Sequence, residues 1–306
     1  MEKTKLDLLK LYQKFCEEIL KKLLTKLKCS TVYFSQEDVT YCINESGVTV
    51  KQDLSSNQEE ADTKVILHCH HALEESLSSK VVLRSPLGDT DKMILALSFL
   101  ESSRTYIDYG NGKSRKGFWL NEICSINEDQ KKSLVGFHAF TGNDYISSFF
   151  RKSKPTCWNV LNKNRILIES INQLGEDWNI DMSDTIIAAL EQFVCALYSY
   201  PREKSVNVVR NKLFEKKYKK EGKVIDMSLL PPCQSVLILH IQRANYVAKM
   251  WKSCLTNWLH PDEIENNGWF PDGTTNWVDD IFPAEIEEIL HDPLFENDDF
   301  DEQDQV

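Results

Sequence analysis

The chain has 306 residues, with 36 Lys and Arg against 47 Asp and Glu, a formal net charge of −11. A chain of this length can bury a hydrophobic core without disulfide bonds. No apolar run approaches the ~20 residues that a membrane helix needs. The acidity argues against a nucleic-acid-binding protein only at first sight, because residues 261–306 contain 16 acidic and no basic residues. Residues 1–260 therefore carry 36 basic and 31 acidic residues and are mildly basic.

The N-terminus is charged throughout and lacks the apolar core of a signal peptide. Nine cysteines are scattered along the chain without a CxxC pair, which argues against a zinc ribbon and a secreted disulfide framework. We therefore expect an intracellular protein, nuclear or cytoplasmic, with no membrane partner.

The first part of the chain combines a helix with short strands. Apolar residues at helical spacing predict an amphipathic helix over residues 4–28. β-Branched and aromatic residues predict three strands at 31–34, 39–43 and 47–50. A polar connector over residues 51–58 follows.

The next part alternates helices and strands. The pattern predicts helices over residues 59–77 and 91–100, and strands over residues 80–84 and 104–109. This alternation predicts an α/β fold in which a mostly parallel sheet lies between two layers of helices.

The remainder follows a basic loop over residues 110–116 and is mostly helical up to an acidic segment. The expected helices cover residues 121–126, 129–140, 156–172, 182–199, 205–220 and 233–258. The predicted domains are an N-terminal helix with small strands (1–58), the α/β core (59–150), a helical region (151–260) and an acidic C-terminal segment (261–306).

Five carboxylates occupy positions that suggest metal chemistry. Glu60 and Asp62 open a predicted helix, Asp89 and Asp91 follow a predicted strand, and Asp144 closes an apolar segment. Ligands of open α/β sheets bind at the carboxyl ends of strands, and Mg²⁺ or Mn²⁺ prefers carboxylate oxygens. Each position also has a structural interpretation, as a helix-dipole partner, an N-cap or a turn residue.

Three segments carry a family resemblance: EEADTKVILHCHHA, VVLRSPLGDTDKMILAL and GFHAFTGNDYISSFF. They resemble an uncharacterised group of transposon-associated animal proteins, which is itself similar to the flap-endonuclease/PIN-like nuclease superfamily. The resemblance implies a PIN-like three-layer domain followed by a helical region. It also implies Mg²⁺- or Mn²⁺-dependent hydrolysis of phosphodiester bonds in DNA or RNA. The matching metal-binding positions are Glu60, Asp62, Asp89, Asp91 and Asp144, of which Glu60, Asp89 and Asp91 would be catalytic.

A second interpretation stays open. The superfamily carries further metal-binding Asp residues upstream, and Asp7 and Asp38 do not follow apolar strands. Because these residues are missing, we expect residues 1–58 to be a truncated part of the nuclease-like domain. The alternative is a catalytically dead, transposon-derived module that binds nucleic acid or protein.

Two basic groups are candidates for nucleic-acid binding, with DNA favoured over RNA. The first, Arg151, Lys152 and Lys154, follows the last carboxylate. The second lies in residues 202–223, which contain nine basic and three acidic residues. Its candidate contacts are Lys212, Lys216, Lys217, Lys219 and Lys220. The alternative is a solvated helix whose Phe214 and Tyr218 point into the core.

Histidines give a weaker signal. His68 and His71 stand at positions i and i+3 of a predicted helix, but no HExxH pattern or cysteine pair completes a zinc site. We expect His138 and His240 to satisfy hydrogen bonds in the core.

Overall fold

The computed structural model describes residues 22, 30–123, 126–179, 184–221, 226–271 and 273. The N-terminal helix predicted over residues 4–28 lies outside these ranges except for residue 22. Most of the acidic segment lies outside them as well.

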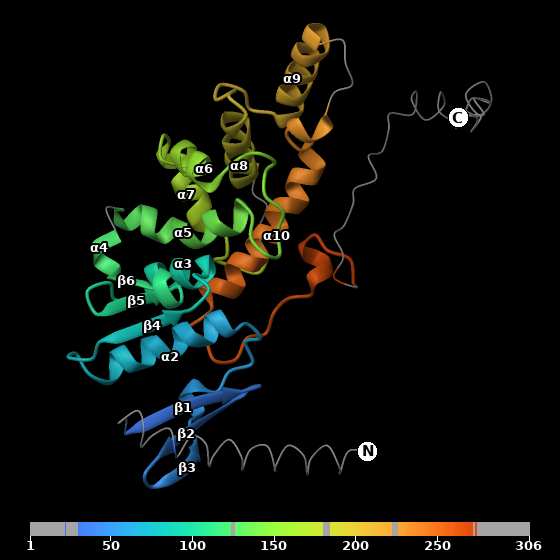
Figure 1. Cartoon of the computed structure of the whole chain (residues 1–306). Helices are drawn as coiled ribbons and strands as arrows, with labels where there is room; N and C mark the ends of the chain where they lie inside the picture. The colour runs from blue at the N-terminus through green and yellow to red at the C-terminus, as the bar shows by residue number, and fades with distance from the viewer. Residues whose placement is uncertain are drawn as a thin grey trace, which may run out of the picture.

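The predicted strands near the N-terminus form an antiparallel meander. Strands β1 (Thr31–Gln36), β2 (Val39–Asn44) and β3 (Gly47–Val50) pair in chain order. Figure 1 shows this sheet at one end of the described molecule, beyond α2 (Ala61–Glu75). Its central strand buries Ile43, which is 1% exposed.

The connector over residues 51–58 is not merely a polar linker. Leu54 is buried, and Gln58 donates from Nε2 to the carbonyl oxygens of Cys254 at 3.1 Å and Thr256 at 2.5 Å. Asn57 exchanges two hydrogen bonds with the backbone of Leu259, at 2.7 and 2.8 Å. The connector therefore fixes the start of α2 to the chain that follows the last long helix.

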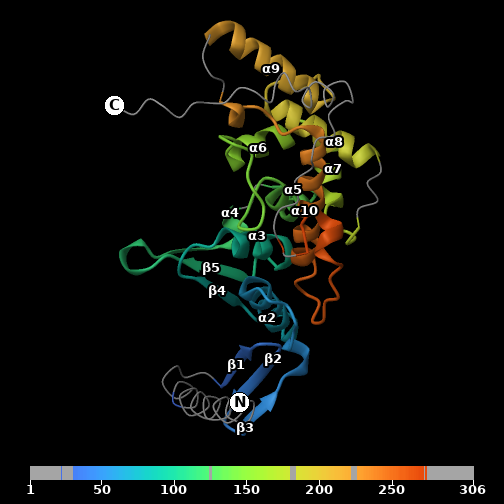
Figure 2. The same ribbon diagram turned by 90° about the vertical axis from the view of Figure 1, so that its right-hand side faces the viewer.

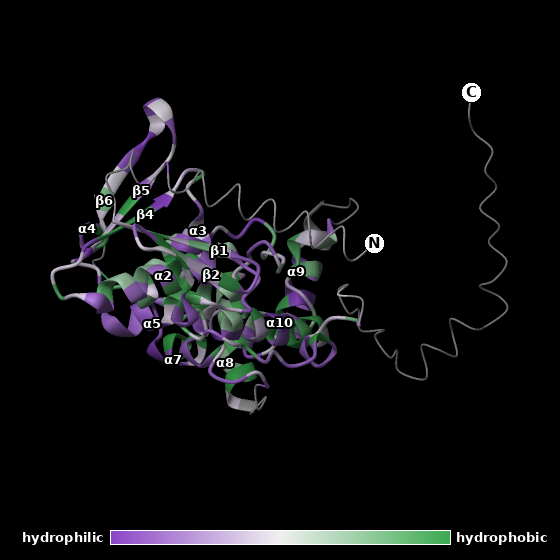
Figure 3. Ribbon diagram, turned by 90° about the horizontal axis from the view of Figure 1, so that it is seen from below, coloured by the Kyte–Doolittle hydropathy of each residue, from purple (hydrophilic) through white to green (hydrophobic). Residues whose placement is uncertain are grey.

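The second sheet is mixed, and the prediction of a mostly parallel sheet is wrong. Strands β4 (Val81–Ser85) and β5 (Thr105–Tyr109) are parallel, as expected, but β6 (Lys116–Trp119) pairs antiparallel with β5. Periodicity missed β6 because it is short and contains Gly117, where a Cβ atom would collide with the Tyr106 ring on β5. The hairpin between β5 and β6 projects from the body (Figure 2), and its tip is largely hydrophilic (Figure 3).

Helices follow the second sheet, as predicted. Asn162, Lys163 and Asn164 interrupt the helix expected over residues 156–172, and Asn164 caps the second half by accepting from the Ile166 backbone N–H. The helices after β4 are α3 (Thr90–Phe99), α4 (Leu120–Ile123), α5 (Glu128–Phe140), α6 (Lys154–Leu161), α7 (Arg165–Gln173), α8 (Asp184–Leu197), α9 (Val206–Glu221) and α10 (Gln234–Lys252). Short 3-10 turns cover Gln52–Leu54, Gly112–Ser114, Met227–Leu229 and Ile264–Asn267.

One hydrophobic cluster runs from α2 through the second sheet to α10. Helix α10 lies beside α5 in both views (Figures 1 and 2) and contributes the fully buried Trp251. His240 on α10 donates from Nε2 to the carbonyl oxygen of Phe140 at 2.8 Å, so it satisfies a core hydrogen bond. The predicted α/β part and the helical region therefore share one core.

Within the described residues, every helix is too short or too polar to cross a bilayer.

Candidate metal centre

Two helices begin with carboxylates at the centre of the molecule. Glu60 is the N-cap of α2, with Asp62 in the first turn, and Asp89 is the N-cap of α3, with Asp91 in the first turn. The Asp89 side chain accepts the Asp91 backbone N–H at 3.0 Å. The positive ends of both helix dipoles offset part of the repulsion among these charges.

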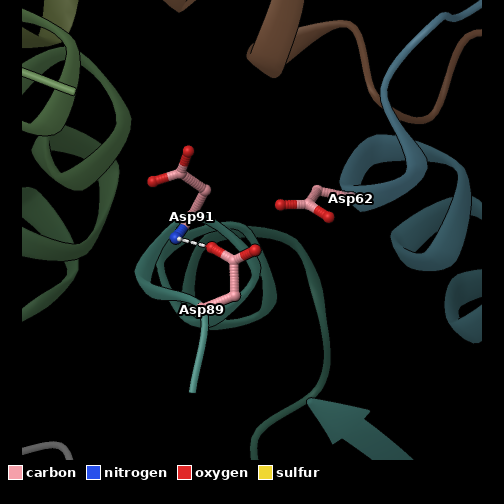
Figure 4. A group of neighbouring side chains, drawn as sticks. All are labelled: Asp62, Asp89 and Asp91. Carbon is pink, nitrogen blue, oxygen red and sulfur yellow. Dashed lines mark hydrogen bonds between the residues drawn. The ribbon is translucent and has the colours of Figure 1, made fainter. Parts of the chain in front are cut away.

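Asp62, Asp89 and Asp91 form one compact group. Each offers a carboxylate oxygen, and the three oxygens lie within 4.8 Å of one another. Figure 4 shows Asp62 reaching from α2 toward the two aspartates on α3. Their side chains are half-buried, at 18%, 35% and 17% exposure. Hard oxygen ligands in this number can hold a divalent cation that keeps several waters.

Lys92 occupies the space between two of these carboxylates. Its Nζ lies 2.7 Å from Asp62 Oδ1 and 3.3 Å from Asp89 Oδ2. Burial alone would lower the pKa of Lys92, but the hydrogen bonds and charges of both aspartates raise it above its ordinary value. The protein thus supplies its own cation to the group.

The two aspartates beside Lys92 differ in their titration. Burial raises the pKa of Asp62, and the charge of Asp89 raises it further, against the effect of Lys92. Burial opposes ionisation of Asp89 as well, but hydrogen bonds from the Asp91 backbone, Asp62 and Lys92 hold its pKa below the ordinary value. A cation bound beside crowded carboxylates favours their ionised form.

A stack of two rings joins Asp91 to Glu60. His138 Nε2 lies 2.6 Å from Asp91 Oδ1, and the His138 ring stacks on Trp251 with centroids 5.3 Å apart. Trp251 Nε1 donates to Glu60 Oε2 at 3.0 Å. His138 is 3% exposed, so its hydrogen bond to Asp91 has little competition from water. The network fixes the orientation of both carboxylates from α5 and α10.

Glu60 lies beside the three aspartates rather than among them. Burial raises its pKa, hydrogen bonds with Tyr145 and Trp251 lower it, and the charges of Asp62 and Asp91 raise it again. Among the residues that the structure describes, the group of mutually close ligand oxygens contains neither Glu60 nor Asp144.

Asp144 is exposed in the turn that follows α5. Gly142 opens this turn with φ +105°, and a Cβ atom there would lie 2.7 Å from the Ser148 Cα. Asn143 Oδ1 accepts the Tyr145 backbone N–H at 2.9 Å. The turn brings Tyr145 to Glu60 and leaves Asp144 at the surface.

The basic residues after this turn have protein partners. Lys152 Nζ donates to the Leu197 carbonyl oxygen at 2.9 Å, and burial lowers its pKa. Lys154 Nζ donates to Gly142 O at 2.6 Å and Thr141 Oγ1 at 3.0 Å, and burial lowers its pKa to about 8. Lys154 thus caps the C-terminal end of α5, and exposed Arg151 lies over the Phe150 ring.

The second basic group lies on α9. Lys212 Nζ pairs with Glu203 Oε1 at 2.5 Å, and Lys216 is exposed. Phe214 is 42% exposed, so it is not a core residue. The side chains of Lys217, Lys219 and Lys220, and that of Tyr218, lie outside the described part of the chain.

Sequence reasoning missed three residues of the centre. Lys92 stands three residues after Asp89, which places both on one face of the first turn of a helix, so its position was readable from spacing. His138 is buried, as expected, but its Nε2 bonds to Asp91 across 47 residues of sequence, and its Nδ1 has no hydrogen-bond partner among the described residues. Trp251 reaches Glu60 across 191 residues, and no local pattern marks such a contact.

No protein-family model, no curated protein and no solved structure matches this chain.

Proposed function

We propose that the chain is a divalent-metal-dependent nuclease-like protein that hydrolyses phosphodiester bonds in DNA or RNA. The proximity of one carboxylate oxygen each from Asp62, Asp89 and Asp91, all within 4.8 Å of one another, carries this proposal. The proposed relationship to the flap-endonuclease/PIN-like superfamily points to the same chemistry, because these three residues match its metal-binding positions. The ion is Mg²⁺ or Mn²⁺, since the ligand set consists of hard oxygens.

In this proposal each residue has a defined task. Asp62, Asp89 and Asp91 would hold the ion, and a bound ion would supply Lewis-acid chemistry for phosphodiester hydrolysis. His138 orients Asp91 through the 2.6 Å hydrogen bond, as outer partners of metal ligands commonly do. Lys92 balances the charge of the aspartates and, once an ion replaces it there, is free to contact a phosphate oxygen.

The proposal is tested by cleavage of labelled single-stranded, flap and duplex DNA, and of the matching RNA, with Mg²⁺ or Mn²⁺. We expect cleavage by the natural protein and its loss in Asp89→Asn/Asp91→Asn, which keeps the side-chain volumes. Asp144→Asn is the matched control for removal of an acidic side chain, because Asp144 is exposed and outside the three-aspartate group. Cleavage that survives the double substitution contradicts the proposal.

A second function is favoured by Lys92. Lys92 pairs with two of the three carboxylates. A protein that had lost its metal ion and its catalytic activity would need such an internal cation, because unpaired buried charges are destabilising. The chain would then be a transposon-derived module that binds nucleic acid or protein. In that case oligonucleotides bind equally well to the natural protein and to Asp89→Asn/Asp91→Asn, and neither protein cleaves them with any divalent ion.

A further inference from the structure

A cavity of about 630 Å³ lies next to the candidate metal centre. Its walls come from the start of α2, the turn after α5, the C-terminal half of α10, and Ile264, Trp269 and Gly273. This volume is within the usual range of small-molecule sites, roughly 300–1,000 Å³. The lining residues that matter for its chemistry are Glu59, Glu60, Tyr145, Tyr246 and Trp269.

The walls are largely aromatic and apolar. Tyr246 and Trp269 meet edge to face, with ring centroids 5.6 Å apart and an interplanar angle of 72°. Trp178 also packs against Tyr246, with ring centroids 5.3 Å apart, and helps to hold that ring in place. Tyr145 borders the cavity and is 55% exposed. Planar rings held in this way offer faces and edges for a flat aromatic ligand.

The charged side chains of the wall are carboxylates. Among the described residues that line the cavity there is no Lys or Arg, whereas Glu59 and Glu60 both contribute. Glu60 is engaged by Trp251 and Tyr145, but Glu59 is exposed. Burial raises the pKa of the Tyr246 phenol, and the charges of Asp262 and Glu59 raise it further. A phosphate would be repelled here, while an N–H donor on a neutral ring would find a carboxylate acceptor.

Glu60 belongs to both the cavity and the surroundings of the metal centre. Its carboxylate lines the cavity, and as the N-cap of α2 it directly precedes the first turn that carries Asp62. A nucleotide whose ring enters the cavity would therefore carry its phosphate toward the three aspartates.

We propose that this cavity receives one nucleobase with an exocyclic amino group from a single-stranded nucleic acid. The base stacks on Tyr246 and Trp269, donates its amino group to Glu59, and so sets which phosphate lies at the three-aspartate centre. The inference rests on the proposed nuclease-like function, which it refines by naming the substrate as unpaired strand with a base preference. Cytosine and adenine can donate a hydrogen bond from their amino groups to the Glu59 carboxylate, whereas thymine has a carbonyl oxygen where cytosine has its amino group.

The test measures binding of fluorescein-labelled oligo-dC and oligo-dT in EDTA, so that cleavage plays no part. We expect oligo-dC to bind more tightly than oligo-dT. Tyr246→Leu or Trp269→Leu should weaken oligo-dC binding by about 5- to 150-fold, the equivalent of one stacked base. Glu59→Gln should remove the preference for dC, since an amide offers both donor and acceptor. Trp258→Leu is the matched control, because Trp258 is 52% exposed and does not line the cavity.

Further controls distinguish loss of the base site from misfolding, and failure of the base-site proposal from failure of the nuclease proposal. Tyr246→Phe keeps the ring and should bind as the natural protein does, and near-ultraviolet circular dichroism checks that each variant is folded. Equal binding of oligo-dC and oligo-dT, or an equal loss in Trp258→Leu, overturns the base site. Failure of cleavage with intact base selectivity overturns the nuclease proposal instead.

Discussion

Replacement of Lys92 by methionine tests whether this lysine occupies the place of a metal ion. The Nζ atom lies 2.7 Å from Asp62 and 3.3 Å from Asp89, and the Lys92 and Asp62 side chains are only 19% and 18% exposed. Exposed ion pairs contribute up to about 1 kcal/mol, whereas removal of one partner from a buried pair costs about 3–5 kcal/mol. For this half-buried pair we expect Lys92→Met to cost about 2 kcal/mol of unfolding free energy, or about 4 °C in Tm.

The informative result is how this cost responds to Mg²⁺. In the natural protein an ion must displace an ammonium group, but in Lys92→Met it enters an uncompensated cluster of carboxylates. Bound at 100 times its Kd, an ion stabilises a folded protein by about 2.7 kcal/mol, so saturating Mg²⁺ should restore the variant to at least its original Tm. Thermal unfolding with EDTA and with Mg²⁺ measures both effects. Lys163→Met, in the exposed loop between α6 and α7, controls for loss of charge.

Acidification should reduce the cost of Lys92→Met in EDTA. The pKa of Asp62 is raised in the folded protein, so the penalty of its charge is present at neutral pH and fades as the carboxylate takes up a proton. The reasoning is refuted if Lys92→Met unfolds at the same temperature as the natural protein. It is equally refuted if Mg²⁺ stabilises both proteins by the same amount.

Four other predictions follow from the structure. His138→Gln should weaken Mn²⁺ binding by about 10- to 100-fold through the loss of its bond to Asp91, measured by titration calorimetry. Burial lowers the pKa of His240 from its ordinary value of 6.5 to about 4. Between these two values the unfolded chain binds a proton that the folded protein does not, so stability decreases as the pH is lowered. His240 should contribute about 2–3 kcal/mol to the stability lost between pH 7 and 4.5, measured by urea unfolding as the difference between the natural protein and His240→Gln. Gly142→Ala should cost more than about 2 kcal/mol, because alanine is strained at φ +105° and its methyl group meets the next turn. Lys216→Gln should lower the salt dependence of oligonucleotide binding by about one contact, and an unchanged slope removes α9 from the interface.

Local pattern predicted most of the elements around the centre. Periodicity placed α2, β4, α3 and β5 within two residues of their observed bounds, because each is a continuous amphipathic or apolar segment. It failed at β6, which contains Gly117 and exposed residues and so lacks the pattern of a strand. Glycine is needed there because a Cβ atom would collide with the Tyr106 ring. The single antiparallel strand changes a predicted parallel sheet into a mixed one.

The centre itself was predictable only in its local part. Asp89 and Asp91 are two residues apart at a strand-to-helix junction, and Asp62 opens the preceding helix, so their proximity follows from the order of the elements. The orientation of these groups depends on His138 and Trp251, which reach them across long stretches of sequence. Such contacts are set by the packing of α5 and α10, and a one-dimensional pattern does not contain that information.

Manganese binding tests the central claim most directly. Electron paramagnetic resonance of Mn²⁺ distinguishes free from bound ion and requires neither substrate nor turnover. If Asp62, Asp89 and Asp91 form a metal centre, the natural protein binds Mn²⁺, Asp89→Asn/Asp91→Asn loses that binding, and Asp144→Asn retains it. If the natural protein and the double variant leave the same amount of Mn²⁺ free, the three aspartates are not a metal centre.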